Sequence, residues 1–251
     1  HKSPYHGFSV EFAEHRTYGQ GDEIRHIDWK LYGKTDRYYV KRYEEETNLR
    51  SYILLDTSKS MSYKSNNITK LKYGESLSAG LTHLMINQKD AVGLILFDNL
   101  IRKYIPPKTS KSHKNIIYNS LSKCKAGENT DIQLILDSMA DRIKKSGLVI
   151  LISDLLDDPK KVMKGLNHFR HNKQEVIVFH LIDKQEFNFE FNERTNFTDM
   201  ETGETITTDP WHIQYSYQDK IKLFINKYKK ECVFRFSYER TPSCIKFFLG
   251  S

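Results

Sequence analysis

Cysteine is scarce in this chain, and its pattern argues against two classes of protein. The three cysteines, Cys124, Cys232 and Cys244, never stand in the C-x-x-C spacing that is typical of zinc and redox sites. An odd and sparse set also argues against the disulfide scaffold on which many small secreted domains depend. We therefore expect reduced cysteines and a cytoplasmic protein.

Long apolar runs and secretion signals are missing as well. No run approaches the roughly 20 apolar residues that a membrane-spanning helix needs, so we expect no membrane span in this chain. No signal peptide is visible. The chain opens on His1 rather than on methionine, which leaves open whether residues precede it.

Several motifs of catalysis and nucleotide binding are absent. Without a P-loop, G-x-x-x-x-G-K-[ST], any ATP hydrolysis would have to come from a partner. The G-x-S-x-G motif of serine hydrolases is missing, and none of the ten histidines has an obvious triad setting. The net charge of +7 permits an acidic partner, but lysine and arginine are scattered among 32 acidic residues. We therefore expect no nucleic-acid binding.

Strand and helix patterns alternate along most of the chain, which indicates an α/β fold. We predict strands at 48–57, 91–97, 101–105, 148–153, 175–182 and 232–238, and helices at 69–88, 110–121, 131–144, 159–171 and 217–230. The first helix should bury a face of leucines, namely Leu71, Leu77, Leu81 and Leu84. Pro106 and Pro107 should end the third strand. This order predicts one doubly wound, mostly parallel sheet.

An insertion at 183–212 interrupts the alternation. The aromatic residues Phe187, Phe189 and Phe191 stand at alternate positions, which predicts an exposed edge strand. Gly203 lies in a Glu-Thr-Gly turn between residues that favour strands, which predicts a β-hairpin with this glycine in the left-handed conformation. We favour a hairpin that caps one edge of the sheet over one that binds a partner.

A polar sequence, D-x-S-x-S, ends the first predicted strand. Ligands of open α/β sheets bind outside the carboxyl ends of the strands, where Asp56, Ser58 and Ser60 would stand. A carboxylate and two hydroxyls are hard oxygen ligands, which suit Mg²⁺ or Mn²⁺. Alone, the sequence is equally compatible with an ordinary polar turn. Thr130, in a polar loop, and Asp154, at the end of another predicted strand, would complete a set of five oxygen ligands.

The order of these five residues resembles the metal-ion-dependent adhesion site of von Willebrand factor A domains. In that family the two serines coordinate Mg²⁺ directly, the threonine does so directly or through water, and the aspartates act largely through water. A sixth position stays open for a carboxylate from a partner. The resemblance implies a metal site formed by Asp56, Ser58, Ser60, Thr130 and Asp154. Neutral hydroxyls would leave the cation electrophilic, so that an incoming Asp or Glu binds strongly.

The N-terminal part carries a second resemblance. The string EF-x-x-x-R-x-Y-x-x-GD-x-x-R-x-IDW starts at Glu11 and is followed by VK-x-Y-E-x-E. It resembles the bacterial family called domain of unknown function 58, whose members are typically encoded beside MoxR-type AAA+ ATPases and are thought to work with them. Structurally, Gly21 and Asp22 should form a turn, Arg25 should pair with Asp22 or Asp28, and Trp29 should cover the core.

We therefore predict an N-terminal extension at 1–47 and a von Willebrand factor A-like domain at 48–251 that includes the hairpin insertion. The expected function is a metal-dependent protein-interaction module without catalytic residues. Its expected partner is a MoxR-type ATPase that supplies an Asp or Glu to the metal. The alternative is a Mg²⁺-dependent phosphatase or phosphotransferase with Asp56 as nucleophile. Such sites usually place a second acid two residues later, where this chain has Ser58.

Overall fold

The computed structural model describes residues 10–19, 21–45, 49–64, 67–127, 131–189, 195–198, 205–208, 210–233 and 245–250. Side chains are described for residues 15–19, 21–40, 49–64, 67–127, 131–189 and 214–228. The chain divides into two compact units, His1–Leu49 and Arg50–Ser251.

The larger unit is built on a six-stranded sheet with the strand order β10-β7-β6-β3-β4-β5. The strands are β3 (Arg50–Asp56), β4 (Ala91–Phe97), β5 (Ile101–Lys108), β6 (Leu148–Ser153), β7 (Glu175–Leu181) and β10 (Ile245–Gly250). Four neighbouring pairs are parallel, and β5 runs antiparallel to β4 at one edge. The expected doubly wound, mostly parallel sheet is therefore confirmed.

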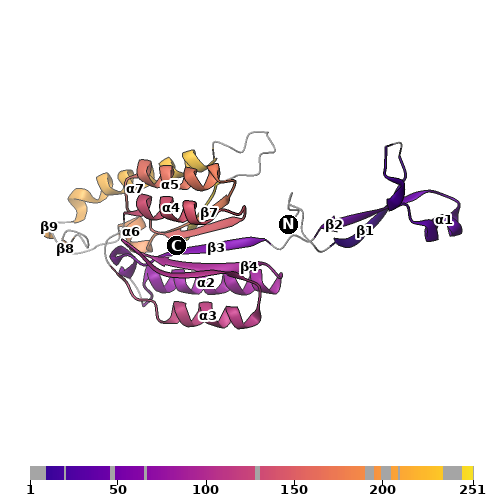
Figure 1. Cartoon of the computed structure of the whole chain (residues 1–251). Coiled ribbons are helices and arrows are strands. Elements are labelled where there is room, and N and C mark those ends of the chain that lie inside the picture. Colours follow the sequence, from indigo (N-terminus) through magenta and orange to yellow (C-terminus); the bar gives the residue numbers. More distant parts are fainter. Residues whose placement is uncertain are drawn as a thin grey trace. The chain divides into compact units, whose positions relative to one another are not determined.

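Helices cover both faces of this sheet (Figure 1). One face carries α2 (Lys70–Asn87) and α3 (Lys111–Ser122), and the other carries α4 (Ile132–Arg142), α5 (Pro159–His171) and α7 (Pro210–Val233). Because both faces are covered, the central strands are apolar almost throughout, and β3, β4 and β6 are buried along nearly their whole length. None of the helices that the structure describes is long and apolar enough to cross a membrane.

The buried face of α2 differs from the expected leucine face. Leu84 is 60% exposed, whereas Gly74, Ser78 and Thr82 face the core. A Cβ atom added at Gly74 would lie 2.7 Å from Cδ1 of Leu55 on β3. The helix thus packs closely on the sheet through small residues. Of the expected leucine face, Leu71 is buried, Leu77 and Leu81 are half-buried, and only Leu84 is exposed.

Two strand predictions were wrong in their bounds. β5 continues through Pro106 and Pro107 to Lys108, because an edge strand can leave a proline without a ladder hydrogen bond. The expected strand at 232–238 is not formed at its start, since Cys232 and Val233 belong to α7. The rest of it, 234–238, lies outside the described residues. The last described strand is β10. The error at 232–233 arose because a short apolar run does not by itself distinguish a strand from part of a buried helix.

The insertion begins with a short helix, α6 (Lys184–Asn188), in place of the expected aromatic strand. Asp183 and Glu186 form a capping box, which favours a helix start over an extended chain. Phe189 ends the helix with φ of 54° and is buried against Tyr217, with 4.6 Å between ring centroids. The strands β8 (Thr195–Thr198) and β9 (Thr205–Thr208) pair antiparallel as the expected hairpin. Phe191 and Gly203 lie outside the described residues.

The smaller unit consists of two antiparallel strands, β1 (Val10–Thr17) and β2 (Tyr39–Glu45), with two short helices between them. These are η1 (Ile24–His26) and α1 (Trp29–Thr35), which begins after its N-cap residue Asp28. The expected turn is present, with Gly21 at φ of 104°.

Two side-chain predictions for this unit were wrong. Arg25 pairs with Glu23, its close neighbour in sequence, while Asp22 binds Arg16 at 2.6 Å. Asp28 is engaged by His15 and by two backbone N–H groups of α1. Trp29 is 57% exposed rather than buried, because it begins a helix of only seven residues that has little core to cover.

Candidate metal centre

Asp56 ends β3 at the carboxyl edge of the sheet, and hydrogen bonds hold both of its carboxylate oxygens. Oδ1 accepts from the backbone N–H of Ser58 at 2.8 Å, and Oδ2 accepts from the Ser153 hydroxyl at 2.6 Å. The side chain is almost fully buried. Burial, together with the nearby carboxylate of Asp154, raises the pKa of Asp56 to about 6. The carboxyl group is thus fixed in orientation, and its ionised form is less favourable here than in water.

Two hydroxyls lie beside this carboxylate. Ser58 precedes the short helix η2 (Lys59–Ser62), and this turn brings the Oγ atoms of Ser58 and Ser60 to 3.0 Å from each other. The intervening loop is anchored to β4, because the backbone N–H and the hydroxyl of Thr57 both donate to the carbonyl of Phe97. Mg²⁺ binds oxygen at about 2.0–2.1 Å in an octahedron, which places adjacent ligands about 3 Å apart. The two serine hydroxyls form a hydrogen bond with each other, and their spacing also fits two adjacent ligands of such a cation.

Asp154 follows β6, the strand next to β3, and is buried as well. Its carbonyl oxygen accepts a hydrogen bond of 2.9 Å from Nε2 of His180. Burial lowers the pKa of His180 to about 4, so this ring is neutral at pH 7 and donates from Nε2. The carboxylate of Asp154 accepts from the ammonium group of Lys70 at 2.8 Å.

Lys70 is the main site residue that the sequence analysis missed. Its side chain is only 4% exposed, and its ammonium also donates to Oε1 of Glu186 on α6 at 3.0 Å. Burial favours a lower pKa for Lys70, but the carboxylates of Asp154 and Glu186 outweigh it and raise the pKa above its ordinary value. A lysine that begins a helix after a polar loop looks solvent-exposed in the sequence, so no local signal marks it.

The charges of this buried cluster are unequal. The ammonium group of Lys70 pairs with the carboxylates of Asp154 and Glu186, and the carboxylate of Asp56 lies near that of Asp154. Uncompensated buried charge is costly, and a divalent cation would remove the excess of negative charge. Within the described part of the chain, no group of three His, Cys, Asp or Glu side chains could hold a metal. A cation here would therefore depend on the serine hydroxyls, as hard-oxygen chemistry allows.

Thr130 lies outside the described residues, and its contribution to the site stays a prediction. The residues on either side of the undescribed segment both make hydrogen bonds, and those of Gly127 reach the loop after Asp56. The N–H of Gly127 donates to the carbonyl of Thr57 at 2.7 Å, and Asp131 caps the start of α4. The structure thus brings together Asp56, Ser58, Ser60 and Asp154, four of the five residues that the sequence proposed.

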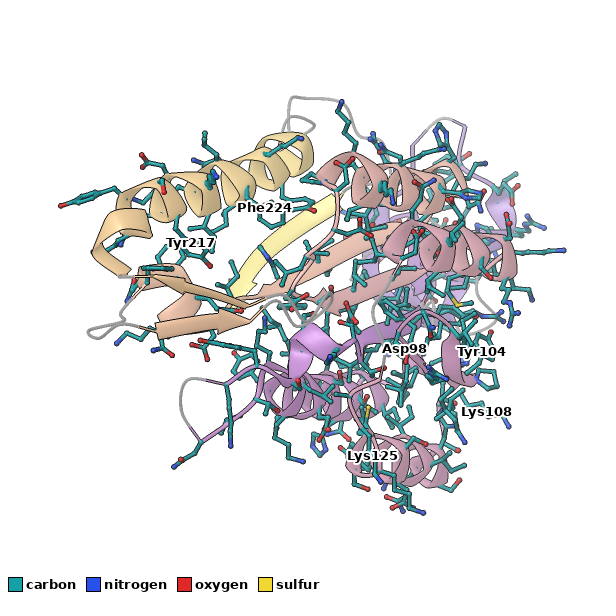
Figure 2. The ribbon with its side chains drawn as sticks, turned by 90° about the vertical axis from the view of Figure 1, so that its left-hand side faces the viewer. Asp98, Tyr104, Lys108, Lys125, Tyr217 and Phe224 are labelled. Atoms are coloured by element: carbon teal, nitrogen blue, oxygen red, sulfur yellow. The ribbon has the colours of Figure 1, made fainter. Side chains whose placement is uncertain are left out.

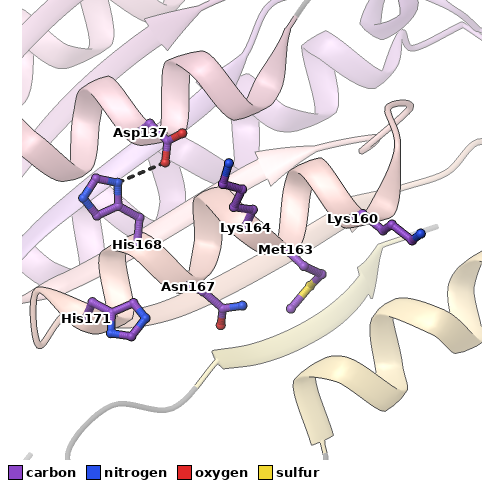
Figure 3. A pocket seen from close by; sticks show the side chains of 7 residues that line it. All are labelled: Asp137, Lys160, Met163, Lys164, Asn167, His168 and His171. Carbon is purple, nitrogen blue, oxygen red and sulfur yellow. Dashed lines mark hydrogen bonds and ion pairs between the residues drawn. The ribbon is translucent and has the colours of Figure 1, made fainter.

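A hollow along α5 offers a different group of ionisable residues (Figure 3). Nδ1 of His168 lies 3.0 Å from Oδ1 of Asp137 on α4. A histidine and an aspartate in contact can form part of a catalytic triad. Among the described residues that line this hollow, however, there is no serine, threonine or cysteine that could act as the nucleophile. The pair connects two helices, and we assign it no catalytic role.

The six-stranded sheet, with helices on both faces and the D-x-S-x-S loop at its carboxyl edge, defines a von Willebrand factor A-like domain. The family model described as "Protein of unknown function DUF58" matches residues 14–221. The chain belongs to this family.

Curated relatives and solved structures were also found. Uncharacterized proteins of Mycobacterium tuberculosis and Mycobacterium bovis are 21% identical over 183 residues, a match that spans 72% of this chain and 57% of each relative. An aerotolerance-related membrane protein from Bacteroides fragilis has a TM-score of 0.48 and 16% identity, with 68% of this chain and 87% of that chain covered. The conserved hypothetical protein BatB from Bacteroides thetaiotaomicron has a TM-score of 0.47 and 14% identity, with 73% and 98% covered.

Proposed function

We propose that this domain is a metal-dependent protein-interaction module. Asp56, Ser58, Ser60, Thr130 and Asp154 would hold one Mg²⁺ or Mn²⁺ ion. When bound, the ion would supply an electrophilic position that accepts a carboxylate from a partner's Asp or Glu. The observation that carries the proposal is the pair of serine hydroxyls 3.0 Å apart beside the buried acid of Asp56.

The chain's own residues would orient the site. Ser153 and the N–H of Ser58 fix the carboxylate of Asp56, and Lys70 fixes that of Asp154. Because these contacts are buried, the oxygens are in place before a cation arrives. Little reorganisation would then be needed on binding.

Exposed apolar side chains at the same edge of the sheet support a protein as the partner. They stand on the loops that follow strands β3, β4 and β6, on the first turn of α4 and on α6. A partner that reached the metal would cover some of these side chains and remove apolar area from water. The residues are Ile68, Leu100, Leu134, Leu156 and Phe187.

Phosphotransfer with Asp56 as nucleophile has less support. This side chain is 2% exposed, and both of its oxygens already accept hydrogen bonds. A nucleophile must reach its substrate, which these contacts oppose. We therefore propose that the domain itself is not an enzyme.

The finer identity of the partner depends on family resemblance. We propose a MoxR-type AAA+ ATPase as the partner and a cytoplasmic location, the latter from the sparse cysteines. Thiol counting on protein unfolded with air oxidation blocked tests the location, and a native disulfide would contradict it.

Titration calorimetry with Mn²⁺ tests the metal site. Wild type should bind one ion, and Asp56→Ala and Ser58→Ala should abolish the binding. Ser62→Ala is the matched control, because this hydroxyl lies in the same turn but donates to the carbonyl of Lys59. Equal binding by wild type and both site variants would exclude the metal site.

A further inference from the structure

A pocket of about 510 Å³ opens beside the candidate metal centre. Thr57 and Gly127 form part of its lining, and Thr57 directly follows the metal-site residue Asp56. The rest of the lining comes from β4, β5, the turn that joins them, α3 and the segment that follows α3. A segment that reaches the metal centre from this side would therefore cross the pocket.

Four cationic side chains and one carboxylate line this pocket. The carboxylate of Asp98 is fully buried, and Nε of Arg102 donates to both of its oxygens, at 2.7 and 2.8 Å. Figure 2 shows Asp98 and Lys125 in the same region of the molecule, away from Tyr217 and Phe224 on α7. This ion pair neutralises the carboxylate, so it does not offset the remaining cations.

The remaining cations are Lys103, Lys123 and Lys125, all of them exposed. None of the three has an ion-pair partner among the side chains that the structure describes. Three like charges around one hollow raise the local positive potential and attract a ligand of opposite charge.

Apolar groups in the same pocket indicate a peptide rather than a small ion. Ile116 on α3 is 52% exposed, and Leu96 on β4 also contributes to the lining. Leu100, in the turn between β4 and β5, is exposed close by in sequence. A segment with acidic side chains and a peptide backbone could use both the lysines and these apolar groups.

We propose that this pocket, the basic pocket, binds an acidic peptide segment of the same partner that offers a carboxylate to the metal. The inference depends on the proposed function, because the basic pocket would be a second contact for the partner segment whose carboxylate binds the metal. Two contacts on one segment would strengthen each other through effective concentration. The preferred partner sequence would thus contain several Asp or Glu residues around the one that binds the metal.

The test uses hexaglutamate as a probe and hexaglutamine as its neutral control, with binding measured by calorimetry in Mg²⁺ and in EDTA. Lys123→Glu/Lys125→Glu removes the charge of the basic pocket. The matched control is Lys220→Glu/Lys222→Glu, an exposed pair on α7 with the same spacing and the same change in net charge. We expect the pocket variant to weaken hexaglutamate binding at least about tenfold, while the control stays within about twofold.

The outcomes separate the two proposals. If EDTA and Asp56→Ala abolish hexaglutamate binding while the pocket variant matches the α7 control, the basic pocket is wrong and the metal bridge stands. If the pocket variant abolishes binding but EDTA has no effect, the pocket stands and the metal bridge is wrong. Equal binding of hexaglutamine, or displacement of hexaglutamate by a tighter-binding single-stranded oligonucleotide, would overturn the assignment of an acidic peptide.

Discussion

The ammonium of Lys70 donates to the carboxylate of Asp154 across 2.8 Å, although the two residues stand 84 positions apart in the sequence. Both side chains are almost completely buried, and the same ammonium binds Glu186. Lys70 thus links the start of α2 to the end of β6 and to α6. It neutralises part of the negative charge that Asp154 and Glu186 bring to this cluster.

Replacing Lys70 with methionine should strongly destabilise the domain. The change would leave Asp154 and Glu186 without their ammonium partner, and breaking a buried ion pair in this way costs about 3–5 kcal/mol. Urea denaturation of Lys70→Met in EDTA would measure the loss. Lys72→Met is the control, since Lys72 pairs with Glu75 from an exposed position and should matter little. A loss no larger than that of the control would contradict the role of Lys70.

Asp56 should make the metal-free protein less stable as the pH rises. Its pKa is about 6 in the folded protein and 3.8 in an ordinary environment. Between these values the folded state holds the proton more tightly than the unfolded state does, so this residue lowers the free energy of unfolding as the pH increases. The penalty is complete above about pH 7 and amounts to roughly 2–3 kcal/mol, at 1.36 kcal/mol per pKa unit.

Asp56→Asn isolates this effect. Urea denaturation in EDTA from pH 4 to 7 should show the variant gaining stability relative to wild type as the pH rises. If the free energy of unfolding changed with pH in the same way for both proteins, burial would not raise the pKa of Asp56. In Mn²⁺ the sign should reverse near neutral pH, because only the ionised wild-type carboxylate contributes to the metal site.

The purified domain should show no turnover of phosphoesters, nucleotides or acyl esters at neutral pH with Mg²⁺ present. One reason is that Asp56 is buried and both of its oxygens accept hydrogen bonds. The other is that no serine, threonine or cysteine is found among the described residues that line the hollow beside His168. A colorimetric screen of wild type and Asp56→Asn checks this expectation. Turnover that disappears specifically in Asp56→Asn would favour the phosphotransfer alternative instead.

Two glycines of α2 should respond in opposite directions to alanine. A Cβ at Gly80 meets nothing within 4 Å, so Gly80→Ala should stabilise the helix by about 0.5–1 kcal/mol. A Cβ at Gly74 would lie 2.7 Å from Leu55, and overpacking of this kind costs about 1–3 kcal/mol. Thermal unfolding should therefore show a higher Tm for Gly80→Ala and a lower one for Gly74→Ala. Stabilisation by both changes would mean that α2 packs less closely than described.

Local pattern was enough to predict the central strands and most helices. β4 and β6 are continuous apolar runs because helices cover both faces of the sheet, and such runs are visible without any contact information. The start of α5 could also be predicted from the local sequence, since Pro159 suits the first turn of a helix. Asp56, Ser58, Ser60 and Asp154 could be proposed because each lies at or just after a predictable strand end.

Other features depend on packing between segments far apart in the sequence. The close packing of Gly74 against Leu55 placed small residues on the buried face of α2 beside Leu71, whereas Leu84 is left exposed. The burial of Phe189 against Tyr217 helped a helix to form where alternating aromatics predicted a strand. Lys70 meets its carboxylate partners, and Lys123 lines the same pocket as Thr57, because the folded chain brings segments that follow β3, β6 and α3 together. Contacts of this kind join residues that are far apart in the sequence, so their spacing along the chain does not predict them.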